Sequence, residues 1–162
     1  MKYGFILIAL QSLVSCYSFK GTSIPEAVNT FNIVPVVDES FSAPSSYPFD
    51  FAEALSLKIR RESKLRLNNE NPDIIFKCKI TQFNVNSQAP VAGATSAINR
   101  LTVVIEVEYI SVKNEKENWK QSFNRFEDFS AEQNFAAEQG RLTQTINNLF
   151  THDIFIKAFS NW

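Results

Sequence analysis

Hydrophobic and polar residues alternate along three stretches of the chain, as they do in strands that bury one face of a sheet. The clearest stretch is residues 99–110, whose apolar positions are Leu101, Val103, Ile105, Val107 and Tyr109. Its other positions are mostly polar or charged, so one face is predicted to be core and the other wet. Residues 73–85 and 119–129 alternate in the same way. The pattern therefore predicts three antiparallel strands.

In residues 73–85 and in residues 119–129, the alternation of apolar and polar positions shifts by one residue at one point. In the first, a β-bulge near Thr81 or Gln82 explains the slip, because one extra residue reverses the faces that follow it. In the second, the slip falls between Phe123 and Phe126. These two aromatic residues are therefore expected on opposite faces of their strand.

Residues 30–37 add a further apolar run, and two later segments have helical spacing. Asp50 and Glu53 have the spacing of a capping box at the start of a helix with apolar positions Phe51, Leu55 and Ile59. Ser130 is a candidate N-cap for a last helix with the stripe Phe135, Leu142, Ile146 and Leu149. The order β-α-β-β-β-α predicts one α+β domain over residues 30–162. Two helices are expected on one face of a mostly antiparallel four-stranded sheet.

The N-terminus has a pattern of its own. Lys2 precedes a short apolar run, and small residues lead to Cys16. This pattern predicts a secretory signal over residues 1–15. The alternative, a buried first helix, lacks the amphipathic period that should follow. Residues 16–29 then form an extended leader of the mature chain.

Composition and residue inventory argue against most chemistry. The net charge of −1 argues against a partner as acidic as a nucleic acid. The one histidine, His152, and the one remaining thiol, Cys78, cannot build a usual zinc site. Cys78 lies on an alternating strand, so a buried hydrophobe is favoured over a reactive thiol or a Cys78–His152 nucleophilic pair. Neither a glycine-rich phosphate loop nor a nucleophile elbow is found. We expect no enzyme, no metal and no cofactor, but a binding or structural role.

Two sets of motifs resemble known proteins. The segment Leu13-Val14-Ser15-Cys16 resembles the lipobox of bacterial lipoproteins, in which the cysteine is acylated. The whole chain resembles the LptE family of lipopolysaccharide-assembly lipoproteins, in the branch found in Bacteroidetes. The matching segments, in chain order, are Tyr17-Ser18-Phe19-Lys20-Gly21, Asn99-Arg100-Leu101-Thr102, Trp119 with Phe123, Phe126 and Phe129, Asp153-Ile154-Phe155, and Trp162.

The resemblance implies a function and a location. Proteins of this family plug the large outer-membrane β-barrel LptD, help it to assemble and help to deliver lipopolysaccharide to the outer leaflet. It also implies a lipid anchor on Cys16 at the periplasmic face of the outer membrane, since Tyr17 stands where Asp tends to retain lipoproteins in the inner membrane. The alternative is a generic periplasmic lipoprotein that binds another envelope partner, without enzymatic activity.

The loop over residues 86–98 is the candidate contact with the barrel. Long loops are usually functional or disordered, and in the resembling family this hairpin reaches into the barrel. We therefore expect Val91, Ala94, Asn99 and Arg100 to contact the barrel or the glycolipid.

Arg100 has two interpretations. Its guanidinium fork suits an acidic group of the lumen or a glycolipid phosphate. Alternatively, it pairs with a carboxylate on its own wet face, such as Glu106 or Glu108.

Overall fold

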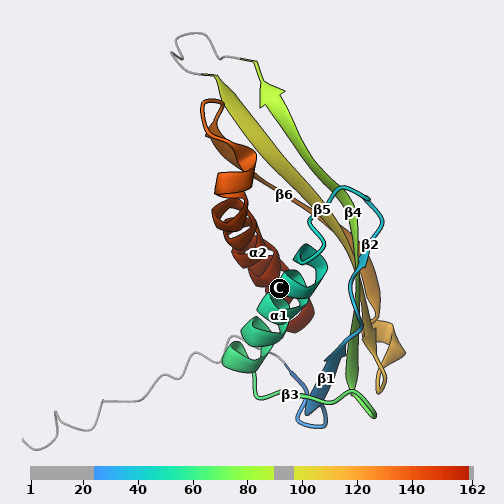
Figure 1. The fold of residues 1–162 in the computed structure, drawn as a ribbon. Helices are drawn as coiled ribbons and strands as arrows, with labels where there is room; N and C mark the ends of the chain where they lie inside the picture. The colour runs from blue at the N-terminus through green and yellow to red at the C-terminus, as the bar shows by residue number, and fades with distance from the viewer. Residues whose placement is uncertain (1–23, 90–96, 161–162) are drawn as a thin grey trace, which may run out of the picture.

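The protein, as a computed structural model, is described over residues 24–89 and 97–160, and it consists of two layers (Figure 1). A curved sheet forms one layer and two helices form the other. In chain order the elements are β1 (Thr30–Ile33), β2 (Val37–Asp38), α1 (Tyr47–Glu62), β3 (Arg66–Leu67), β4 (Ile74–Gln88), β5 (Ile98–Ser111), the 3-10 turn η1 (Glu115–Glu117), β6 (Trp119–Ser130) and α2 (Phe135–Phe159).

The sheet has six strands in the order β3-β1-β4-β5-β6, with β2 beside β4 further along. The long strands β4, β5 and β6 are antiparallel as predicted, and the register shifts between Ile80 and Gln82, where the bulge was expected. The expected four-stranded, mostly antiparallel sheet is nevertheless wrong, because β1 and β2 pair with β4 in parallel and β3 pairs with β1 in parallel.

The error has two causes. The predicted strand at residues 30–37 divides into β1 and β2 around Pro35, which has no N–H to donate to a sheet. The chain then crosses through α1 before it returns as β4, and a crossover through a helix makes the strands that it joins parallel. Two further residues, Arg66 and Leu67, form the short strand β3, which the sequence analysis did not predict.

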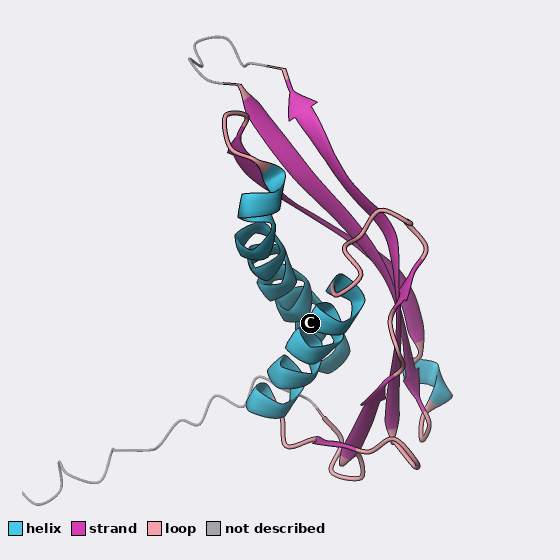
Figure 2. Cartoon of the chain, in the orientation of Figure 1, coloured by secondary structure: helices cyan, strands magenta, loops and turns pink. Residues whose placement is uncertain are grey.

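Both helices lie on the same side of the sheet, as predicted (Figure 2). Their starting points differ from the prediction. The first helix begins at Tyr47, with Pro48 in its first turn and no capping hydrogen bond from the side chain of Ser46. The second begins after Asn134, whose side chain accepts a hydrogen bond from the N–H of Ala136 at 2.8 Å. The predictions based on capping residues Asp50 and Ser130 therefore placed the first residues of both helices incorrectly.

The core lies between the two layers. Among the apolar positions predicted to be buried, these are fully buried: Phe51, Leu55, Leu101, Val103, Ile105, Leu142 and Ile146. Leu149 is instead 41% exposed, because the helix turns Phe150 inward with Leu142 and Ile146. Cys78 is buried, as predicted.

One buried polar contact joins the helices. The hydroxyl of Tyr47 on α1 donates to Oδ1 of Asn147 on α2 at 2.9 Å, and both residues are buried. Burial raises the pKa of Tyr47 above its usual range, with the nearby Asp50 charge as a lesser cause. A satisfied polar pair in an apolar contact favours one alignment of the helices over others.

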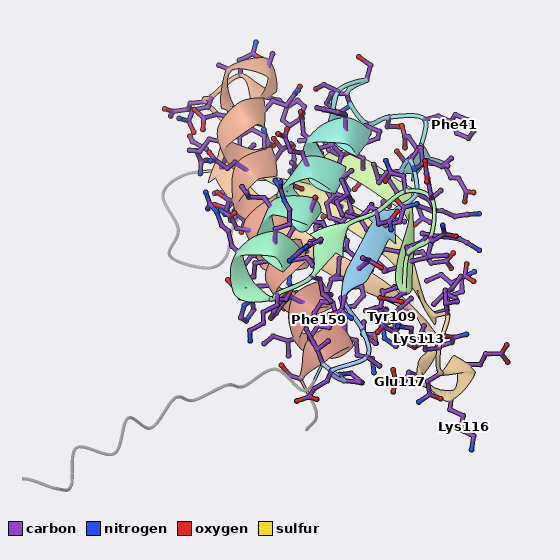
Figure 3. All side chains as sticks on the ribbon, turned by 90° about the horizontal axis from the view of Figure 1, so that it is seen from below. Phe41, Tyr109, Lys113, Lys116, Glu117 and Phe159 are labelled. Carbon is purple, nitrogen blue, oxygen red and sulfur yellow. The ribbon has the colours of Figure 1, made fainter. Side chains whose placement is uncertain are left out.

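Figure 3 views from below the end of the molecule that holds Lys113, which we call the base. There, Asp73 connects several segments of the chain. Its carboxylate accepts hydrogen bonds from the backbone N–H groups of Asn29 and Thr30 at 2.8 and 3.0 Å, and it pairs with Lys113 Nζ at 2.8 Å. These contacts hold the pKa of Asp73 far below its usual range. The hydrogen bond from Lys113 has the largest effect, and the Asn29 N–H has the next largest. The start of β1 is thereby tied to β4 and to the turn after β5.

Candidate functional site

The structure offers little that resembles a catalytic centre. Within the described residues, no three His, Cys, Asp or Glu side chains are placed to hold a metal ion. Burial raises the pKa of Cys78 to about 12, so its thiol stays protonated at neutral pH. His152 lies within α2. None of the helices in the described part of the chain combines the length and apolar character needed to cross a membrane.

The surface with the most distinctive chemistry is the face of the sheet opposite the helices. In β5 and β6 it is formed by the even-numbered residues, since the odd-numbered ones face the helix layer. We divide this outer face into two halves. The base half comprises Lys77, Lys79, Glu106, Glu108, Lys120 and Ser122. The hairpin half, toward the β4–β5 hairpin, comprises Gln82, Asn84, Asn86, Arg100, Thr102, Val104, Asn124, Phe126 and Asp128.

The base half is crossed by ion pairs between neighbouring strands. Lys77 on β4 lies 3.7 Å from Glu108 on β5, and Lys120 on β6 lies 2.9 Å from Glu106. Lys79 extends the row outward to Glu39, at 2.7 Å. Each charge therefore already has a partner within the protein.

The hairpin half consists mostly of amides and hydroxyls. Its charged members, Arg100 and Asp128, form a two-point pair in which Arg100 Nε and Nη2 donate to the two carboxylate oxygens at 2.7 and 2.9 Å. The guanidinium also lies over the ring of Phe126, 3.8 Å from its centroid. The hydrogen bonds from Arg100 lower the pKa of Asp128. The pair is only partly buried, with side-chain exposures of 31% and 35%.

The second interpretation of Arg100, an ion pair with a carboxylate on its own face of the sheet, is therefore correct, but the suggested partners Glu106 and Glu108 are wrong. Glu106 and Glu108 are taken by lysines, and Arg100 pairs across to Asp128 on β6. Two of the five guanidinium N–H groups bind this carboxylate, which leaves three to face other groups. Arg100 therefore retains donors for an external acceptor.

The other predicted site residues are only partly described. The side chain of Asn99 accepts a hydrogen bond from Ser87 Oγ at 2.9 Å, which links the two strands beside the loop. Val91 and Ala94 of the loop, and the predicted lipidation residue Cys16, lie outside the described residues.

Phe126 and Asp128 were missed as site residues by sequence reasoning. The phase slip between Phe123 and Phe126 was the available signal, because it predicted the two rings on opposite faces. In the structure Phe123 is buried against the helices and Phe126 is 50% exposed on the outer face.

Comparison with known proteins gives a family and a fold. A family model described as "LptE: Lipopolysaccharide-assembly" matches residues 28–157. No curated protein matches the sequence.

Several solved structures have a similar fold at 7 to 10% sequence identity. One is a minor lipoprotein from Acinetobacter baumannii, with a TM-score of 0.53 and 8% identity over 82% of this chain and 94% of that one. Another is a PelC variant from Paraburkholderia phytofirmans, described as a dodecamer. Its TM-score is 0.55 and its sequence identity is 10%, over 88% of this chain and 95% of that one. A protein from Xanthomonas campestris has a TM-score of 0.56 and a sequence identity of 7%, over 78% of this chain and 81% of that one. At such identities the similarity shows the fold alone.

Proposed function

Since this chain belongs to the LptE family of lipopolysaccharide-assembly proteins, we propose that it plugs an LptD-type β-barrel in the outer membrane and helps to deliver lipopolysaccharide to the outer leaflet. Membership of the family implies an envelope lipoprotein with a role in lipopolysaccharide transport and assembly, and the family is not enzymatic. The finer proposal concerns the partner, the membrane and the surface used.

The hairpin half of the outer face is the observation that carries this proposal. Amide and hydroxyl groups can both donate and accept hydrogen bonds, so they adapt to the mixed polar wall of a water-filled lumen. They also avoid the cost of removing an ionised group from water on binding. The β4–β5 hairpin extends beyond the helix layer at one end of the molecule (Figure 1). This half would therefore meet a surrounding wall before the helices do.

We assign the contact with the barrel or glycolipid to Arg100 of this half, to its chain neighbour Asn99, and to Val91 and Ala94 of the adjoining loop. Arg100 supports the assignment because its planar fork is held in place by Asp128 while part of it stays exposed. A guanidinium with free N–H donors suits either a barrel carboxylate or a glycolipid phosphate.

Photocrosslinking in living cells tests the assignment. Probes at positions 91, 94 and 102 should crosslink to a large outer-membrane barrel, whereas a probe at Arg61, on the exposed side of α1, serves as the matched control. A crosslink from Arg61 alone would contradict the proposed surface. Crosslinks only to another envelope protein, with no barrel after mild detergent extraction, would favour the generic periplasmic lipoprotein instead.

The lipid anchor is tested separately. Cys16→Ala should abolish fatty-acid labelling and leave an unprocessed or soluble product, because the acyl chains attach through this thiol. Each buried methylene group contributes about 0.8 kcal/mol to membrane binding, so stable anchoring needs more than one acyl chain. Metabolic labelling with a clickable fatty acid measures the modification. Label that persists on the alanine variant would contradict an anchor at Cys16.

A further inference from the structure

The free edge of β6, together with the groove between β6 and α2, forms a site that we propose accepts an extended segment of another protein as an added strand, with a carboxylate of that segment facing Lys157. This site uses the outward backbone groups of β6, whereas the proposed barrel contact uses side chains of the outer face; Asn124, Phe126 and Asp128 belong to both. It neither requires nor excludes the barrel contact.

The first support is the direction of the backbone groups of β6. Just beyond the paired strands, the N–H of Ala131 donates to the carbonyl of Ala97 at 3.1 Å, which marks this pair as hydrogen-bonded. Since such pairs alternate along an antiparallel ladder, the odd-numbered residues of β6 bond to β5. The even-numbered residues direct their N–H and C=O groups outward, and these are Lys120, Ser122, Asn124, Phe126 and Asp128.

These outward groups have no strand partner in the described part of the chain. The sheet ends at β6. Along Lys120–Asp128, the carbonyl of Asn124 accepts a hydrogen bond from Arg125 Nη1 at 3.0 Å, which confirms that this carbonyl faces away from β5. A long unpaired edge is a template for another strand unless something blocks it.

A groove runs beside this edge. It has a volume of about 670 Å³ and is lined by β6 residues from Gln121 to Arg125 and by α2 residues that include His152, Ile156 and Lys157. Side chains of a strand alternate between its two faces. An added strand would therefore direct every second side chain into this groove and the others toward the outer face.

The charges in the groove favour an acidic segment. Arg125 and Asp153 neutralise each other as an ion pair. Lys157 lies over the ring of Trp119, 5.9 Å from its centroid, and within the described residues it has no carboxylate partner. The groove thus carries one cation without a carboxylate partner among the described residues, in a mostly polar lining to which Phe123 and Ile156 add apolar surface. A carboxylate on an incoming strand would compensate this charge.

The test uses the full chain and a defined probe. An eight-residue peptide of alternating Val and Thr with one central Glu is titrated against the isotope-labelled protein, and a peptide with Lys in place of Glu is the matched probe. We expect NMR shifts at the amides of residues 120–128 and at Lys157, with the Glu peptide bound more tightly. Charge reversal by Lys157→Glu should invert this preference.

Proline variants test the backbone pairing. Asn124→Pro removes an outward N–H but none of the N–H groups bonded to β5, and a proline is tolerated at such an edge position. The lost hydrogen bond should weaken peptide binding by about tenfold. Ser87→Pro is the control, since Ser87 stands opposite Asn99 on the other free edge and its N–H faces away from β5. It should leave binding unchanged, and thermal unfolding should verify that both variants are folded.

Three outcomes would overturn the proposal. The first is no shift with either peptide at millimolar concentration. The second is binding that is indifferent to both Asn124→Pro and Lys157→Glu. The third is an edge that is already occupied, either by a second copy, seen as concentration-dependent dimerisation lost in Asn124→Pro, or by residues 17–23 of the same chain, seen as shifts of the β6 amides when these residues are deleted.

Discussion

The base half and the hairpin half of the outer face lie on the same three strands but differ in how their polar groups are used. In the base half, lysines and glutamates on neighbouring strands pair with each other, and the two Ile positions beyond them, Ile75 and Ile110, are opposite one another in the register. In the hairpin half, Arg100–Asp128 is the single cross-strand ion pair within the described residues, and uncharged amides and hydroxyls surround it. A surface whose charges are mutually satisfied has little to offer a partner, whereas amides and hydroxyls keep their hydrogen-bonding capacity available.

The opposite face shows a related gradient. Behind the base half, Phe76 packs against Tyr109 and Phe159 with ring centroids 5.4 and 6.3 Å apart. Toward the hairpin, Val85 on β4 faces the helix layer but is 36% exposed. Stability is therefore expected to reside mainly at the base, and the hairpin end is expected to serve contact.

The largest effect should come from matched truncations of two phenylalanines on opposite faces. Phe76→Ala should lower the free energy of unfolding by about 3–5 kcal/mol, because it leaves a cavity in the core. Phe126→Ala should cost about 1 kcal/mol or less, the size of an exposed cation–π contact. Urea denaturation measures both, and equal losses would contradict the division of roles.

The next effect concerns Asp73 at the base. Asp73→Asn should lower the free energy of unfolding by about 1–3 kcal/mol at pH 7, because the N–H groups of Asn29 and Thr30 and the Lys113 ammonium lose their charged acceptor. The folded-state pKa of Asp73 lies below its usual 3.8. Its stabilisation is therefore fully present above pH 3.8 and is lost as the pH falls through the lower folded-state value.

Denaturation at a series of pH values checks this prediction. The difference between the wild type and Asp73→Asn should be constant from pH 7 to about pH 5 and should shrink below the ordinary aspartate pKa near 4. Asp128→Asn, at the hairpin end, should show the same direction with a smaller difference. A difference that grows on acidification would contradict the assigned role of the Asp73 carboxylate.

A smaller change in stability is expected when a charge is added to either half. Thr102→Lys and Ser122→Lys should each change the free energy of unfolding by no more than about 0.5 kcal/mol, since both positions are on the outer face. Only Thr102→Lys should reduce the barrel crosslink, because only it places a charge among the amides of the hairpin half. Equal crosslinking in the two variants would remove this half from the interface.

The smallest effect is a local one. Arg100→Lys should raise the pKa of Asp128 toward 3.8, because the two-point hydrogen bond is lost while the charge is kept. NMR titration of the side-chain carboxyl carbon measures this pKa. Asp73, at the base, should titrate as before. A pKa of Asp128 that stays unchanged would show that the Arg100 fork does not set it.

The predictions from local sequence were accurate for features that depend on neighbours along the chain. The alternation of Leu101, Val103 and Ile105 identified the buried face of β5, and the slip at Thr81 identified the bulge, because the two-residue period of a strand is written directly in the residue order. The burial of Cys78 follows from the same period. The order of motifs also identified the family, which the family model confirms.

Tertiary structure decided the features that depend on distant segments. Whether Arg100 pairs with Glu106, Glu108 or Asp128 depends on which strand lies beside β5, and Asp128 is 28 residues away in the chain. The parallel pairing of β1 and β2 with β4 was decided by the crossover through α1, and Leu149 lost its expected place in the core when Phe150 turned inward. Periodicity specifies which side of an element is apolar. Which side chains meet across elements is decided only when the elements pack together.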